Sequence, residues 1–250
     1  MNRDDQGPGR RIAHRDGRAL HRLHPRPAPT AALPRPGGLG RGEPLHRHEH
    51  GDGLVTIAVR DSQLPLRYLR GVLGFRLSQY LRLGWICPAL VQQRALYHEP
   101  ARPPYGVEDV HIITLGQADG RILGYVGLSG SYDQVPLALD APDRPRLTTE
   151  TAHQVDLLRR YAGPGLDTHR VFEVKRFLRN LDMERGTQAS LVPWHIVLGF
   201  GRSLLALGGP QRRVLAVGDA KEQVAIRHLL LMGLDLEVVG APRPACPGPS

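Results

Sequence analysis

The chain has 250 residues, of which only two are cysteines and 5% are aromatic. Cys87 and Cys246 lie far apart and match no metal-binding or redox spacing, so neither a disulfide framework nor a metal site is expected. The longest apolar runs, such as residues 196–207, contain glycine and arginine and fall short of the roughly 20 residues that span a bilayer. The first residues form no apolar stretch, so we expect no secretory signal, no membrane span and a cytoplasmic protein.

Lysine is also scarce, and arginine therefore dominates the charge. The chain has 33 basic against 24 acidic residues, a formal net charge of +9, and all but Lys175 and Lys221 of the basic residues are arginine. A GC-rich coding sequence accounts for such a skew without any function. The functional alternative is an anionic partner, because the guanidinium fork binds two phosphate oxygens at once. Candidate partners are a phosphopantetheine carrier, a nucleotide-bearing thioester and a nucleic acid.

Composition divides the chain into three parts. Residues 1–53 are rich in Arg, Pro, Gly and His and lack aliphatic periodicity, so they bury too little apolar surface to offset their ordering entropy. We expect them to form a disordered N-terminal extension, on which the alternating His46, His48 and His50 are incidental rather than metal ligands. Residues 54–241 form the folded domain. Residues 242–250, rich in proline and glycine, are expected to be a flexible tail.

The order of elements within the folded domain favours an α/β class. Its sheet is expected to be mixed and mostly antiparallel, with helices on both faces. The Asp119-Gly120 pair between two apolar runs predicts a hairpin. The predicted strands are 55–60, 110–115, 121–128, 171–178, 213–218 and 236–239. The predicted helices are 64–83, 86–97, 148–161, 191–207 and 221–232.

The strand at 171–178 carries charges among its apolar side chains. Val171, Val174 and Phe177 predict a half-buried strand. Glu173 and Arg176 must then find each other, a ligand or water, because an unpaired buried charge is costly. A structural pair of Glu173 with Arg176 or with Lys175 is the alternative to a functional site.

Several short motifs support a resemblance. The strand Phe-Glu-Val-Lys-Arg-Phe at 172–177 resembles the aromatic-Glu-Val-Ser-Arg-Phe strand of the autoinducer-synthase branch of GNAT acyltransferases, a branch that includes N-acyl amino acid synthases. The hairpin at 119–128, the amphipathic helix at 69–85 with its Gly-Trp end, and residues 214–233 are similar to the same branch. The resemblance covers roughly residues 66–240 and implies a GNAT-like fold.

The resemblance implies an N-acyltransferase that moves an acyl group from an acyl-CoA or acyl-carrier-protein thioester to a small amine. Glu173 would accept a proton from the attacking amine. Backbone N–H groups at 176–178 would stabilise the oxyanion. Arg176 would position Glu173 or bind an acceptor carboxylate.

The same resemblance implies where the substrates bind. The phosphopantetheine pyrophosphate would lie at the start of the helix that follows the strand, where free N–H groups favour anions. Its implied contacts are Phe177, Leu178, Arg179, Arg185, Gly186 and Thr187. Asp109 would bind the acceptor amine, and Trp85 and Trp194 would line an acyl pocket, with a place in the core as their alternative.

Departures from the family pattern narrow the substrate. Lys175 replaces the usual serine, and Gly127 and Leu128 occupy the zone where homoserine lactone synthases have an arginine, which argues against S-adenosylmethionine as acceptor. Leu229 stands where many acetyltransferases have a tyrosine acid, which favours the acyl-carrier branch. The alternatives are an inactive binding protein of this fold, an arginine-rich nucleic-acid-binding protein, and an acyltransferase that uses aminoacyl-tRNA. No recognition motif supports nucleic acid specifically.

Overall fold

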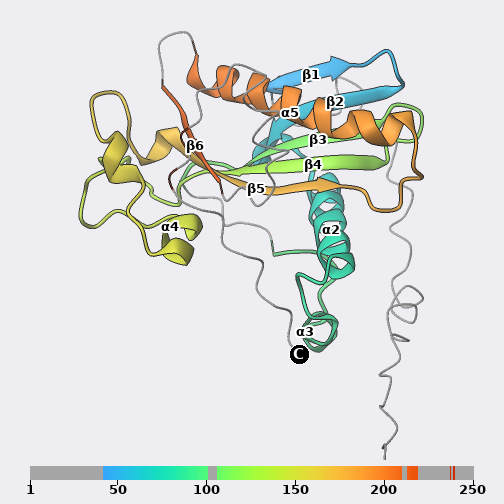
Figure 1. Cartoon of the computed structure of the whole chain (residues 1–250), viewed down its shortest axis with the longest axis horizontal. Coiled ribbons are helices and arrows are strands. Elements are labelled where there is room, and N and C mark those ends of the chain that lie inside the picture. The colour runs from blue at the N-terminus through green and yellow to red at the C-terminus, as the bar shows by residue number, and fades with distance from the viewer. Residues whose placement is uncertain (1–41, 101–105, 210–212, 219–236, 238, 240–250) are drawn as a thin grey trace, which may run out of the picture.

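The computed structural model describes residues 42–100, 106–209, 213–218, 237 and 239. Within this part, six strands form one sheet in the order β1-β2-β3-β4-β5-β6 (Figure 1). The strands are β1 His46–Glu49, β2 Leu54–Arg60, β3 Val110–Gly116, β4 Ile122–Ser129, β5 Val171–Arg179 and β6 Leu215–Val217. All neighbours are antiparallel except β5 and β6, which are parallel. The predicted α/β class with a mixed, mostly antiparallel sheet is confirmed.

Helices cover both faces of the sheet. The α-helices of the described residues are α2 Leu66–Arg82, α3 Pro88–Gln93, α4 Thr148–His153 and α5 Thr187–Gly208. Helix α5 crosses one face, called here the α5 face, and α2 packs on the opposite face, called the α2 face (Figure 1). The helix expected at 221–232 lies outside the described residues, as do residues 236 and 238 of the strand expected at 236–239.

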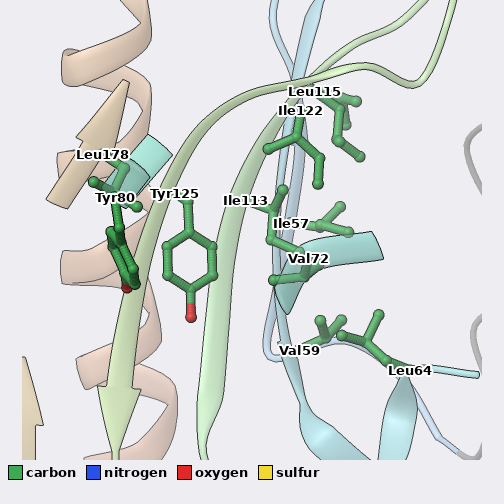
Figure 2. Packing of buried hydrophobic residues seen from close by; sticks show 11 residues of the cluster. Ile57, Val59, Leu64, Val72, Tyr80, Ile113, Leu115, Ile122, Tyr125 and Leu178 are labelled. Atoms are coloured by element: carbon green, nitrogen blue, oxygen red, sulfur yellow. The ribbon is translucent and has the colours of Figure 1, made fainter. Parts of the chain in front are cut away.

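Each face has its own apolar core, because alternate residues of a strand point to opposite sides. The cluster on the α5 face brings Val126 and Phe172 of the sheet against Val192 and Ile196 of the helix. The cluster on the α2 face includes Val72 and Tyr80 of α2 with Ile57, Ile113, Tyr125 and Leu178 of the sheet (Figure 2).

Helix α5 lies unusually close to the sheet. A Cβ atom on Gly199 would lie 2.7 Å from Thr56 Cγ2 and 2.9 Å from Ile112 Cγ2, distances that real side chains do not adopt. Glycine at this position therefore permits the helix to approach the strands. The helix is also long and apolar enough, by length and composition, to cross a membrane, and 44% of its most apolar window is buried inside the protein. The core helix of a soluble protein meets the same criterion of length and composition.

The boundary expected at residue 53 is wrong. Residues His46–Glu49 form strand β1, which pairs with β2 at the edge of the sheet, His46 opposite Ala58 and Glu49 opposite Val55. The imidazole of His50 stacks on that of His195 from α5, with ring centroids 3.4 Å apart. Composition could not reveal this strand, because backbone pairing and ring stacking hold it rather than aliphatic burial. Residues 1–41 of the expected extension lie outside the described residues.

The histidine stack makes β1 sensitive to acid. The pKa of His50 is lowered to about 4, first by burial and then by the nearby imidazoles of His195 and His48; Asp52 acts in the opposite direction. Since the folded state resists protonation of His50, its contribution to stability is complete above the ordinary pKa of 6.5 and is lost as pH falls toward about 4. We expect the NMR signal of the His50 ring protons to show a titration midpoint near pH 4. The signal is assigned through its absence in His50→Gln. A midpoint near 6.5 would show that the ring is not packed as described.

Three helices differ from their predicted bounds. The helix predicted at 148–161 ends at His153, because Gln154 adopts a left-handed conformation with φ 56°, and a separate 3-10 turn covers Leu158–Tyr161. Helix α5 begins four residues before the predicted 191, with Pro193 inside it. The region predicted as a helix over 86–97 contains only the six residues of α3.

Candidate functional site

Strand β5 is irregular at its centre. Tyr125 of β4 lies opposite Leu178, but Gly127 lies opposite Lys175, so β5 has one extra residue between the two pairs. This is a β-bulge at 176–177, and bulges are frequent next to active sites. Within the described residues, β6 pairs with β5 only over Val171–Glu173, so the bulged half of β5 has β4 as its one strand neighbour. The predicted oxyanion donors at 176–178 therefore lie in the part of the strand with irregular hydrogen bonding.

Glu173 lies just before this bulge, and its side chain is held from several directions. One carboxylate oxygen accepts hydrogen bonds from the Thr149 amide at 2.6 Å and the Thr149 hydroxyl at 2.7 Å. The other lies 3.1 Å from Lys175 Nζ. The Glu173–Lys175 pair foreseen as the structural alternative is therefore present. The side chain of Arg176, the other predicted catalytic residue, lies outside the described part of the structure.

These contacts determine the protonation of Glu173. Burial alone would raise the pKa of its carboxyl group, but hydrogen bonds from Thr149 and the charge of Lys175 outweigh burial and leave the pKa below its usual value. Glu173 is thus ionised at neutral pH. A carboxylate has about four lone-pair sites, and three of those of Glu173 are occupied by these contacts.

A polar network that the sequence analysis missed lies on the α2 face beside β5. His111 of β3 contacts the Tyr125 hydroxyl through Nδ1 at 2.9 Å and Asp61 through Nε2 at 2.5 Å. Arg76 of α2 donates to the hydroxyls of Tyr125 and Tyr80, both at 3.2 Å, and pairs with Glu99 at 2.6 Å. The two tyrosine rings belong to the cluster drawn in Figure 2.

The network lies in register with the site. His111 is opposite Gly127, and Gly127 is opposite Lys175, so the three residues follow one another across β3, β4 and β5. Burial raises the pKa of Tyr125 far more than Arg76 lowers it, so the hydroxyl stays protonated. A histidine within the aliphatic run at 110–115 was the one signal in the sequence that pointed to this network.

A pocket of about 510 Å³ opens at the start of α5. Its walls are the β3–β4 turn and the segment that leads from β5 into α5, and they include Arg121, Arg185, Gly186 and Thr187. The buried Asn180 fixes this segment by donating its side-chain amide to the Ile122 carbonyl at 2.8 Å. Three of the predicted thioester contacts are therefore brought together at the N-terminus of a long helix, a position that favours anions.

The other predicted site residues are scattered. Leu178 is buried in the core of the α2 face, whereas Phe177 and Arg179 are exposed on β5. Asp109 accepts hydrogen bonds from the Ser129 hydroxyl at 3.0 Å and the Gly130 amide at 3.2 Å, which joins the ends of β3 and β4.

Both tryptophans are exposed at the surface. Trp85 is 54% exposed beyond the end of α2, where its ring tilts against Tyr80, and Trp194 is 39% exposed on α5. Trp85 follows α2 and Trp194 lies on α5, and these two helices pack on opposite faces of the sheet. Such exposure contradicts the alternative that places both rings in the core.

Among the described residues, no group of three or more His, Cys, Asp or Glu side chains is arranged to hold a metal ion. Comparison of the chain with protein-family models, curated proteins and solved structures finds no match. The functional assignment therefore depends on the geometry and on the motifs in the sequence.

Proposed function

We propose that the protein is an N-acyltransferase that moves an acyl group from an acyl-CoA or acyl-carrier-protein thioester to the amine of a small, amino-acid-like molecule. The observation that carries the proposal is the bulge of β5, which lies along the chain between Glu173 and the segment that enters the pocket at the start of α5. The walls of this pocket carry Arg121 and Arg185 as well as Asp119 and Glu184. The resemblance of residues 172–177 to GNAT acyltransferases supports the same conclusion.

The arrangement suits a thioester with a long phosphorylated arm. Its phosphates would bind at the α5 N-terminus beside Arg121 and Arg185, and the arm would run back along β5 toward Glu173. The six residue steps from Glu173 to Arg179 span roughly 20 Å at the usual strand rise of about 3.3 Å. A long flexible carrier arm is needed to cover such a distance, whereas a short acyl donor would not reach both ends.

In the proposed reaction, the amine nitrogen attacks the thioester carbon, a C–N bond forms and the C–S bond breaks. Backbone N–H groups of the bulge at 176–177 stabilise the oxyanion. The ammonium group of the tetrahedral adduct is far more acidic than the ammonium form of the free substrate. An ionised Glu173 can therefore accept its proton through one water molecule although its pKa is low. The protonated Glu173 then returns this proton, through the same water, to the departing thiolate, which leaves as the thiol.

The contacts of Glu173 favour a second candidate, a binding protein of the same fold without catalysis. A carboxylate with a lowered pKa that is tied to Thr149 and Lys175 also suits a purely structural role. Such a protein would bind CoA or a carrier protein without releasing thiol. Incubation with acyl-CoA thioesters and a panel of amino acids distinguishes the two, with thiol release followed by absorbance and the amide by mass spectrometry. Binding without thiol release or amide would establish the second candidate.

The pocket leads to a prediction for the KM of the thioester. Replacing Arg185 by Ala should raise the KM for the thioester about 10- to 100-fold, because a hydrogen bond to a charged group contributes about 1.5–3 kcal/mol. The turnover number should change little, since Arg185 follows the end of β5 whereas Glu173 lies near its start. Arg146→Ala, at an exposed arginine outside the pocket, is the matched control. Equal KM values for the two variants would remove the pocket from substrate binding.

A further inference from the structure

The segment that follows α2 exposes an apolar surface. The side chains of Leu83, Trp85, Leu90 and Tyr97 are 39%, 54%, 39% and 74% exposed. Over residues 83–97 only Val91 is buried, and the other side chains of this segment are exposed or half-buried. We call Leu83, Trp85, Leu90 and Tyr97 the α3 tip. In Figure 1 the segment stands at the end of α2 that points away from the sheet.

The charged residues of the segment that carries the α3 tip all have one sign, with His left out of account. Residues 62–98 contain five arginines and no aspartate or glutamate. Two of these arginines are neutralised from outside the segment, Arg76 by Glu99 and Arg82 by Asp182. Arg94 is exposed within the tip segment itself, and Arg67 and Arg70 are exposed in the first turns of α2.

This combination selects between two kinds of partner. A protein partner needs a surface of complementary shape, and a short projecting segment provides little area for one. A lipid surface has no fixed shape. Trp, Tyr and Leu enter its headgroup region, while arginines bind its anionic lipids. A projecting tip with exposed aromatic and leucine side chains, on a segment whose own charged residues are all arginine, matches the second kind.

We propose that the α3 tip is a membrane-binding surface that inserts Trp85 and Leu90 into the headgroup region of an anionic lipid bilayer. The protein would lie on the membrane without crossing it, with the sheet and α5 in water. This proposal is independent of the acyltransferase reaction. It concerns a different surface from the α5 pocket, and it holds equally if the protein only binds its ligands.

The two tryptophans of the chain provide a residue-specific test. In the full-length Trp194→Phe variant, Trp85 is the sole reporter; in Trp85→Phe, Trp194 is. With vesicles of phosphatidylcholine and phosphatidylglycerol, we expect a blue shift of Trp85 fluorescence and its quenching by brominated acyl chains, and neither effect for Trp194. Vesicles of phosphatidylcholine alone should bind much less protein, because the electrostatic attraction is absent.

Charge substitutions extend the test. Leu90→Asp should weaken vesicle binding by at least about tenfold, because it places a charge in the inserted surface. Leu205→Asp, at a 66% exposed leucine on α5, should have no effect. Vesicle binding without a change at Trp85 would assign the binding to other basic parts of the chain and overturn the proposal. Absence of vesicle binding, with Trp85 fluorescence responding only to an acidic protein such as an acyl carrier protein, would overturn it in favour of protein docking.

Discussion

Replacing Glu173 by Gln is expected to lower kcat/KM for acyl transfer about 10²- to 10⁴-fold, the usual contribution of a proton acceptor. The glutamine oxygen still accepts the two hydrogen bonds from Thr149, so the fold is preserved. What is lost is the negative charge, and with it the capacity to take a proton. The rates come from thiol release at saturating and limiting thioester, and the fold is checked by circular dichroism.

The pH dependence separates catalysis from a structural role. Because the pKa of Glu173 lies below its ordinary 4.5, the carboxylate causes no loss of activity between pH 5 and 8. Lys175→Met removes a charge that lowers this pKa, so the acid limb of the pH–rate profile should move to higher pH. Asp140→Asn, at an exposed carboxylate, should change neither rate nor profile. Full activity of Glu173→Gln would exclude Glu173 from the mechanism.

The largest effect on stability is expected at Glu150, the acceptor around which the segment between β4 and β5 is organised. Its carboxylate receives two hydrogen bonds of 2.7 Å from Arg144, and it also accepts the amides of Leu147, Leu157 and Leu158. Both side chains are buried. Arg144→Met should therefore lower the free energy of unfolding by about 3–5 kcal/mol, because it leaves the Glu150 charge buried without its partner. Urea denaturation provides the measurement.

The matched control for Arg144→Met is an exposed pair. Arg160 lies 3.2 Å from Glu237, and both side chains are more than half exposed, so Arg160→Met should cost less than about 1 kcal/mol. The pKa of Glu150 is lowered, since hydrogen bonds and the charge of Arg144 outweigh burial. Its stabilising contribution is therefore present above about pH 4.5 and is lost as pH falls further. Similar losses for Arg144→Met and Arg160→Met would show that the buried pair is not the organising contact.

The strands that sequence patterns predicted best are those with aliphatic runs. Val110–Gly116 and Ile122–Ser129 form the hairpin expected around Asp119-Gly120, and Val171–Arg179 exceeds its prediction by one residue. In these strands, burial of Val, Ile and Leu side chains determines the structure, and such burial leaves a pattern in the sequence. Strand β1 has no such pattern, because its His-Arg-His-Glu sequence is held by pairing with the edge of β2. His50, which follows β1, stacks on His195.

The site was predictable only in part. A short motif indicated Glu173, and the start of the following helix indicated Arg185, Gly186 and Thr187. Thr149, the partner of Glu173, and Asp61, the partner of His111, were not predictable, because they come from distant parts of the chain. Their contacts arise from the packing of α4 on β5 and from the turn that follows β2. Long-range contacts of this kind leave no spacing that a single sequence can show.

The most direct test of the acyltransferase account is mass spectrometry of the metabolites from a host that expresses the chain, compared with the same host expressing Glu173→Gln. We predict a new acylated amine in the cells with the unaltered chain, and its absence from those with the variant. Identical metabolites in both strains, combined with purified protein that releases no thiol from any acyl thioester, would contradict the account.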